Sequence, residues 1–572
     1  MTFAARIAPV FALLLSASPA LAGYEFSDAS SSLSGSYLAG RYAGKLRDMD
    51  LATRYFEQAL RDDPNNPVLI ERVFVFSLSQ GDINAAEEYA TRVLSFNSQH
   101  RMARIVLGLR DLRLRHYPEA REHFKKSAYT PIGELTSTLL IAWSYAGEGN
   151  QKEALKTLDA LDANDSFANF KAFHAALIAD YLGLPLRAEG FYKKAYEQAA
   201  TSLRVVQAYG NFLERTGRKE EAGKVYGQFL STAEHNPLVR EALAGIDADR
   251  TVKPLISSPL AGVGEGLFSI ASALSDDQGI DVALMYAQLA LSVDANHDIA
   301  LTLLGDLYEE MENYPRAIAA YDRIPQGSLL RSNAEIEVAI NLQKLGKSDE
   351  AKARLKTLLA KNPRDSEAIT TLGNIYRNNE EFADAAAAYS QAIALVPIPT
   401  RSDWTLFYYR GISYERMKQW DKAEADLRRA LALEPDQPMV LNYLGYSMIE
   451  KRINLLQAMD MVRKAVELKP NDGYIVDSLG WAHYQLGEYD DAVKELERAV
   501  ELKPADPVIA DHLGDAYWRA GRQLEARFQW QHAKDNKPET ADLARIERKL
   551  KDGLAEVPPV TPVENKSDQT KG

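Results

Sequence analysis

A chain of 572 residues is longer than one hydrophobic core usually serves, so its length predicts either several domains or an array of repeats. The formal net charge of −13 argues against binding to nucleic acid, which needs clustered Lys and Arg, and against adhesion to an anionic membrane surface. The absence of cysteine excludes disulfides, thiolate metal sites and a cysteine nucleophile.

Residues 1–22 are predicted to be a signal peptide. Arg6 gives a positive start, residues 7–15 form an apolar run, and Ala-Leu-Ala at 20–22 is typical of a cleavage site before Gly23. No cysteine follows the run, so this is not a lipoprotein signal. No later stretch reaches the ~18 to 20 uninterrupted apolar residues of a membrane span. These features predict export to the periplasm of a bacterium.

Residues 23–235 are predicted to form a first block of six two-helix units, from about Leu33 to Glu234. Their spacing pattern is weak; the first unit shows it at Ala52, Phe56 and Pro64. The register then breaks over residues 236–262, where an extra helix at 238–246 precedes a stretch rich in Pro and Ser. We interpret 236–262 as a joint between two blocks, and the glycines at 262–266 as a linker.

Residues 263–538 carry a clearer pattern, which predicts eight more units. In three of these units Leu-Gly is followed by an aromatic residue or His about three residues on, by Ala some twelve residues after the Gly, and by a closing Pro. Gly480 and Gly514 lie one period of 34 residues apart. The corresponding glycine of another unit is Gly373, and the closing prolines are Pro397, Pro504 and Pro538. This pattern resembles the tetratricopeptide repeat.

The resemblance implies an all-α, right-handed superhelical solenoid of about fourteen helix-turn-helix repeats. Small residues let the paired helices approach closely, and proline ends each unit. The small residues include Gly305, Gly445 and Gly480 on first helices and Ala317, Ala385 and Ala492 on second helices. The twelfth unit carries one extra residue before Ala458. Residues 539–555 are predicted to be a polar-faced capping helix, and 556–572 a disordered tail.

No motif predicts catalysis, a cofactor or a metal site. The glycines at 262–266 follow no strand, so they are not a phosphate-binding loop. Residues 294–298 imitate the start of a calcium loop, but Ile299 occupies the sixth position and Tyr308 the twelfth, which predicts an inter-repeat turn. The histidines show no metal-binding spacing with a Glu between them. We therefore expect no enzyme activity.

In such solenoids the first helices line a concave groove, which the sequence predicts to bind partner proteins or peptides. In the twelfth to fourteenth repeats the predicted groove carries aromatic and acidic side chains. They are Asn442, Tyr446, Tyr474, Asp477, Trp481, Tyr484, Asp511, Asp515 and Trp518. For Trp481 and Trp518, packing in the core is an equal alternative.

The chemistry of the groove suggests what it would bind. Some tetratricopeptide proteins hold a terminal carboxylate with Lys, Asn and Arg, but Asp477 and Asp511 stand at those positions and would repel it. The acidic side chains are harder to explain as packing, because an unpaired buried carboxylate is costly. A basic or aromatic segment of a partner fits better.

Residues 441–500 (LNYLGYSM to KELERAV) also resemble exported bacterial repeat proteins, among them adaptors of carboxy-terminal processing proteases. The main hypothesis is a protein-binding scaffold in the bacterial cell envelope. The alternatives are a structural part of an envelope or polysaccharide-export assembly, a substrate adaptor for a periplasmic protease, and a self-assembling solenoid.

Overall fold

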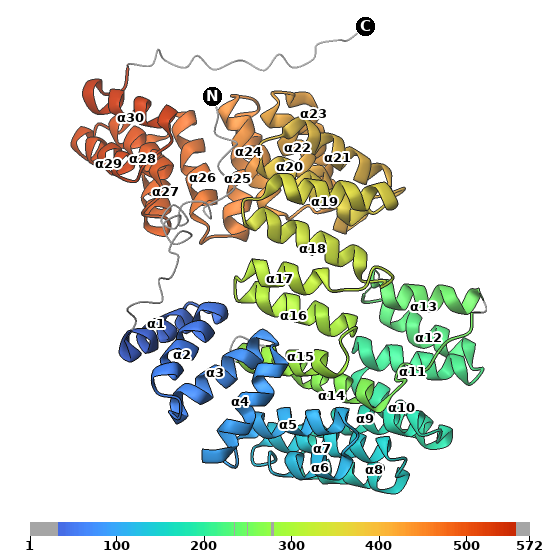
Figure 1. The fold of residues 1–572 in the computed structure, drawn as a ribbon. Coiled ribbons are helices and arrows are strands. Elements are labelled where there is room, and N and C mark those ends of the chain that lie inside the picture. The colour runs from blue at the N-terminus through green and yellow to red at the C-terminus, as the bar shows by residue number, and fades with distance from the viewer. Residues whose placement is uncertain (1–31, 234, 249, 276–278, 556–572) are drawn as a thin grey trace. The chain divides into compact units, whose positions relative to one another are not determined.

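The computed structural model describes residues 32–233, 235–248, 250–275 and 279–555, and these form helices with no strand among them (Figure 1). The predicted signal peptide (1–22) and tail (556–572) lie outside the described residues. The chain divides into two compact units between Lys361 and Asn362. We refer to residues 32–361 as the N-terminal unit and to residues 362–555 as the C-terminal unit.

The N-terminal unit begins with six helical pairs, as the sequence predicts. The pairs are α1 (Leu33–Lys45) with α2 (Met49–Asp62), α3 (Pro67–Gln80) with α4 (Ile83–Phe96), α5 (Arg101–Arg113) with α6 (Tyr117–Lys125), α7 (Pro131–Gly147) with α8 (Gln151–Thr157), α9 (Ala168–Tyr181) with α10 (Pro185–Ala199), and α11 (Leu203–Arg215) with α12 (Lys219–Leu230). Two short 3₁₀ turns, η1 (Leu158–Ala163) and η2 (Asp165–Phe167), join α8 to α9. The extra helix predicted at 238–246 is α13 (Pro237–Asp247).

Three further pairs complete this unit. They are α14 (Pro259–Ala273) with α15 (Ile280–Val293), α16 (Asp298–Glu310) with α17 (Tyr314–Asp322), and α18 (Arg331–Lys344) with α19 (Ser348–Lys361). The prediction that residues 262–266 form a linker is wrong, because they lie inside α14. Small side chains are needed there for close helix packing rather than for flexibility. The division into two blocks at 236–262 stays a prediction.

The C-terminal unit contains the last five pairs and one closing helix. The helices are α20 (Ser366–Asn378) with α21 (Phe382–Ala394), α22 (Trp404–Arg416) with α23 (Trp420–Leu433), α24 (Pro438–Glu450) with α25 (Leu455–Leu468), α26 (Gly473–Leu486) with α27 (Tyr489–Leu502), α28 (Pro507–Arg519) with α29 (Gln523–Asp535), and α30 (Thr540–Asp552); the 3₁₀ turn η3 (Arg401–Asp403) precedes α22. The described residues thus form fourteen pairs, and the predicted all-helical repeat fold with a capping helix is confirmed.

Glycine sets the approach of the two helices within a pair. A Cβ built on Gly480 would lie 2.5 Å from Leu496, and one on Gly514 would lie 2.4 Å from Trp530. In both pairs the bulky residue follows the glycine by sixteen positions. In the α24–α25 pair the spacing is seventeen, from Gly445 to Val462. The extra residue predicted there is accommodated by left-handed backbone at Arg452 and Asn454 (φ 55° and 47°).

Candidate partner-binding site

All nine predicted groove residues lie on three consecutive first helices of the C-terminal unit, α24, α26 and α28. Because α26 contacts both α24 and α28, these residues share what we call the inner face of this unit. The structure separates them by exposure. Five are buried, namely Asn442, Tyr446, Asp477, Asp511 and Asp515. Tyr474, Trp481, Tyr484 and Trp518 are partly exposed.

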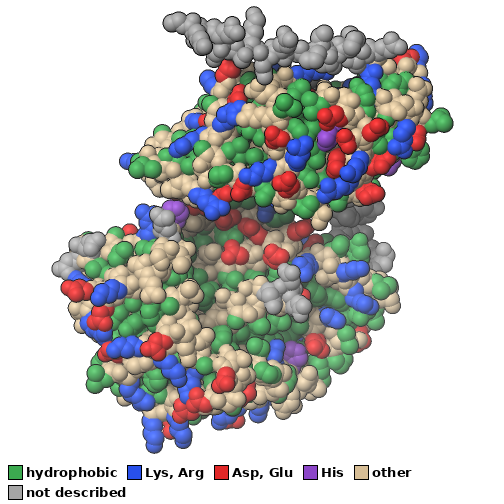
Figure 2. Space-filling model, turned by 180° about the vertical axis from the view of Figure 1, so that it is seen from behind, with side chains coloured by type: hydrophobic (Ala, Val, Ile, Leu, Met, Phe, Trp, Pro, Cys, Tyr) green, Lys and Arg blue, Asp and Glu red, His purple; other side chains and the backbone are tan. Residues whose placement is uncertain are grey.

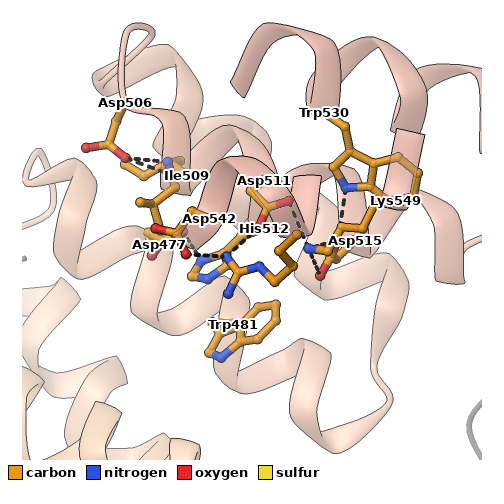
Figure 3. A network of polar contacts seen from close by, with 12 residues as sticks. Asp477, Trp481, Asp506, Ile509, Asp511, His512, Asp515, Trp530, Asp542 and Lys549 are labelled. Carbon is orange, nitrogen blue, oxygen red and sulfur yellow. Dashed lines mark hydrogen bonds and ion pairs between the residues drawn. The ribbon is translucent and has the colours of Figure 1, made fainter. Parts of the chain in front are cut away.

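Asp511 and Asp515 are paired inside the protein by the capping helix α30 (Figure 3). The Lys549 ammonium lies 2.8 Å from Asp511 Oδ1 and 2.6 Å from Asp515 Oδ1. Arg545 donates a second hydrogen bond to Asp511, at 2.8 Å. Contrary to the expectation from the sequence, Asp511 and Asp515 are therefore buried as parts of internal ion pairs. Their cations come from a helix beyond the repeats, which satisfies the buried charges.

Asp515 also binds a buried tryptophan, a contact that the sequence did not predict. It accepts a hydrogen bond from Trp530 Nε1 at 2.9 Å, while the neighbouring Gly514 makes room for the same indole ring. The same arrangement recurs in two other pairs, where Tyr321 donates to Asp306 beside Gly305 and Tyr389 donates to Asn374 beside Gly373. The signal in the sequence is Gly followed by Asp or Asn, with Tyr or Trp sixteen residues after the Gly.

Asp477 supports a stack of three rings. Asp477 Oδ1 lies 2.9 Å from His512 Nδ1, and although burial lowers the pKa of His512, the carboxylate raises it overall. The imidazole lies parallel to the indole of Trp481, with ring centroids 4.0 Å apart. Trp481 also stacks on Tyr484 at 4.6 Å, and its Nε1 donates to Glu450 at 2.6 Å. Trp481 is therefore held in one orientation while its side chain remains partly exposed.

Trp518 belongs to the packing around the capping helix. Its ring centroid lies 5.4 Å from that of Trp530, and a Cβ on Gly553 would lie 2.2 Å from its ring. The end of the described chain thus packs against Trp518, so we consider separately the other partly exposed aromatic residues, Tyr474, Trp481 and Tyr484, which all lie on α26. We call these three residues the α26 aromatic surface.

In the N-terminal unit the inner face is covered by the chain itself. Helix α14 packs on α7 and α9, and α15 packs on α3 and α5, so both lie against the first helices of the pairs. A Cβ on Gly262 would lie 2.4 Å from the ring of Trp143, which shows how closely α14 approaches α7. Glu265 of α14 is fully buried, accepts from Arg204 Nε at 3.0 Å and lies 3.3 Å from His297 Nε2. The Arg204 guanidinium and His297 hold the pKa of Glu265 well below its usual range, although burial alone would raise it.

His174 lies under α14 and makes the stability of this unit depend on pH. It is fully buried, burial lowers its pKa to about 4, and Trp143 Nε1 donates to its Nδ1 at 3.5 Å. The unfolded chain takes up a proton below about pH 6.5, whereas the folded chain does so only near pH 4. The contribution of the neutral His174 to the free energy of unfolding is therefore fully present above about pH 6.5. It is lost as the pH falls toward 4, by up to about 3 kcal/mol.

Replacing His174 with Gln is expected to flatten this pH dependence. Amide hydrogen exchange of α7, α9 and α14 should show wild-type protection falling more steeply than that of the variant between pH 7 and pH 4.5. Parallel pH profiles for the two proteins would contradict the assignment to His174. The exposed His116, changed to Gln, is the matched control.

One cluster of described side chains has the geometry for a cation. His483, Glu488 and Asp491 have ligand atoms within 4.8 Å of one another, and His483 Nδ1 lies 2.6 Å from Glu488 Oε2. The two carboxylates are exposed, and such groups are common without an ion, so we assign the cluster no role. Among the described residues, no helix combines the length and the apolar character that crossing a bilayer requires.

Comparison with known families gives three matches, all to tetratricopeptide-repeat models, over residues 339–398, 404–437 and 480–521. The TPR repeat-containing protein PA4667 of Pseudomonas aeruginosa is 31% identical over 200 residues, which is 35% of this chain and 33% of that protein. The lipoprotein NlpI homolog of Haemophilus influenzae is 31% identical over 101 residues, or 18% of this chain and 32% of that protein. The chain thus spans about a third of the length of these two relatives. A solved structure of the APC/C hetero-tetramer Cut9–Hcn1 matches 92% of this chain and 97% of its own, with 18% identity and a TM-score of 0.38.

Proposed function

Because the chain is a tetratricopeptide-repeat protein, we propose that it is a protein-binding scaffold of the bacterial cell envelope, with its partner site on the α26 aromatic surface. The observation that carries the proposal is the stack of Trp481 on His512 and Tyr484. Aromatic side chains are enriched where protein interfaces concentrate their binding energy. A ring already fixed by its neighbours loses little freedom when a partner binds.

The carboxylates of the inner face are not proposed as the main partner contact. Asp477, Asp511 and Asp515 are already paired within the protein, so an incoming basic segment would have to displace an internal partner. We therefore assign the contact to the aromatic rings and expect an apolar or aromatic segment of the partner to lie on them. Reversing the charge of Asp511 would disturb the capping helix and is not a clean test of binding.

Changing Trp481 to Ala is expected to weaken capture of the partner by about 30-fold or more, since a central aromatic anchor contributes about 2 kcal/mol or more. The measurement is crosslinking capture in cells with the full chain, followed by mass spectrometry. The control is Leu456→Ala, because Leu456 is 77% exposed on the second helix α25, away from the inner face. Equal thermal stability of both variants separates lost binding from lost folding.

The identity of the captured proteins decides among the remaining functions. A protease among them supports the adaptor role, and co-purified export or outer-membrane components support a structural role in an envelope assembly. Capture of the chain alone, or capture that Trp481→Ala leaves unchanged, would contradict the α26 aromatic surface as the partner site. The proposal involves no catalytic step.

The envelope setting has a separate test. It is supported by the predicted signal peptide and by similarity to the lipoprotein NlpI homolog. Mass spectrometry of the protein isolated from its host should give an N-terminus at Gly23 in an osmotic-shock fraction. A chain that keeps Met1 and stays with the spheroplasts would contradict export.

A further inference from the structure

A cavity of about 430 Å³ opens at the start of the N-terminal unit, among α1, α2, α3 and α15. Its wall is apolar on one side, where the rings of Phe56 and Phe76 stack with centroids 5.6 Å apart and Met285 of α15 lies nearby. Four cationic side chains line it as well: Arg41, Lys45, Arg47 and Arg72. We call this cavity and its lining the N-terminal basic pocket.

The four cations are exposed, and none forms an ion pair with any residue that the structure describes, although the Arg41 guanidinium lies over the Tyr37 ring, 5.9 Å from its centroid. This sets them apart from neighbours in the same unit, where Arg316 pairs with Asp50 and Arg113 pairs with Glu87. On the face shown in Figure 2, acidic and basic side chains are interspersed over most of the surface. The pocket therefore gathers four cations in a chain whose formal net charge is −13.

Helix stability accounts for only one of these cations. Lys45 lies in the last turn of α1, where a positive charge is favourable. Arg41 lies one turn before it on the same side of the helix, and like charges four residues apart destabilise a helix slightly. Arg47 follows α1 in left-handed backbone (φ 57°), and Arg72 comes from α3. Three elements thus bring positive charge to one place without an internal acceptor among the described residues.

We propose that the N-terminal basic pocket binds an acidic peptide segment of a partner protein. An apolar side chain of the peptide would lie against the partly exposed Phe76 and Met285, with the buried Phe56 ring stacked on Phe76, and its carboxylates would pair with the surrounding Arg and Lys. Guanidinium groups suit this role because they bind carboxylates through two parallel hydrogen bonds. The apolar wall favours a peptide over a simple anion, because burial of an apolar group adds to the charge interaction.

This site is separate from the α26 aromatic surface and lies in the other unit, so the two proposals can fail independently. Among the lining residues the one carboxylate is Asp281, in the first turn of α15. Asp281 should repel an acidic ligand. Replacing Asp281 with a neutral residue should therefore tighten binding of the acidic ligand, and a damaged fold could not produce that result.

The test is fluorescence anisotropy of the full chain with a labelled pool of short peptides that alternate Asp or Glu with apolar residues and have blocked ends. The same pool with Lys in place of the acidic residues measures binding that does not depend on negative charge. The double variant Arg41→Glu with Lys45→Glu is expected to lose about tenfold or more in affinity for the acidic pool. Asp281→Asn is expected to gain a few-fold.

The control is Lys194→Glu with Lys224→Glu, two exposed cations of α10 and α12 that do not line the pocket. It changes the net charge equally and is expected to bind like the wild type. Trp481→Ala should also bind the acidic pool normally. Equal affinity for the acidic and Lys pools would overturn the proposal, and so would equal losses in both double variants. If ATP or pyrophosphate binds at the pocket and the peptides do not, the site takes small anions and the proposal is wrong.

Discussion

Replacing Lys549 with Met is expected to lower the free energy of opening of the C-terminal end of the protein by about 3–5 kcal/mol. Lys549 lies within 2.8 Å of Asp511 and 2.6 Å of Asp515, and both carboxylates are almost completely buried. Methionine fills a similar volume but leaves Asp515 without a cation. A buried charge that loses its partner costs far more than the pair itself contributes.

Hydrogen exchange of the full chain measures this loss locally, in the amides of α28, α29 and α30. The matched control is Lys551→Met, an exposed lysine on the same helix, which should change protection by less than about 0.5 kcal/mol. Adding Asp515→Asn to Lys549→Met removes the unpaired charge and keeps an acceptor for Trp530. This second change should restore about 1–2 kcal/mol. If Asp515→Asn makes the single variant still less stable, the loss does not come from an unpaired charge.

Replacing Gly262 with Leu is expected to detach α14 from α7, at a cost of about 3 kcal/mol or more in local stability. A Cβ at this position would lie 2.4 Å from the fully buried ring of Trp143. Real Cβ contacts are never so short, so one helix must move. Movement of α14 also strains the buried contact of Glu265 with Arg204.

Exchange of the α7 and α14 amides should increase together in this variant, while α28 to α30 remain as protected as in the wild type. The matched control is Gly190→Leu in α10, where a Cβ would meet nothing within 4 Å. That change should be neutral or stabilise α10 by up to about 1 kcal/mol, since Leu favours helix more than Gly. Equal protection of α7 and α14 in Gly262→Leu and the wild type would show that α14 does not rest on α7.

The candidate site was predictable from the sequence only in part. The repeat period placed Trp481, Asp511 and Asp515 on first helices, because position within a repeat follows from spacing alone. Their environment did not follow from it, because the cations that pair with Asp511 and Asp515 come from α30. The capping helix itself was predicted, but not the face by which it docks. The use of the α26 aromatic surface by a partner stays a prediction.

The sequence by itself determined the helix pairs and the contacts between helices that are adjacent in the chain. Gly480 meets Leu496 and Gly514 meets Trp530 because, in these pairs, sixteen residues separate the two points where the paired helices face each other. The 34-residue repeat pattern predicted about fourteen pairs and the extra residue between α24 and α25, and the polar face of the last helix predicted the capping helix. The physical reason is that each repeat packs mainly on the adjacent repeats, so local pattern and local structure agree.

Only the tertiary structure decided which distant parts of the N-terminal unit meet. Thr136 Oγ1 lies 2.8 Å from the Tyr286 hydroxyl, 150 residues away, and Gln288 contacts Ser79 across 209 residues. These contacts place α14 and α15 on the inner face of the first repeats. They depend on the curvature of the solenoid, which results from a small rotation between each repeat and the next. The sequence of a single repeat does not show the total rotation over many repeats. For this reason residues 262–266 resembled a linker in the sequence, although in the folded protein their small side chains let α14 lie against Trp143.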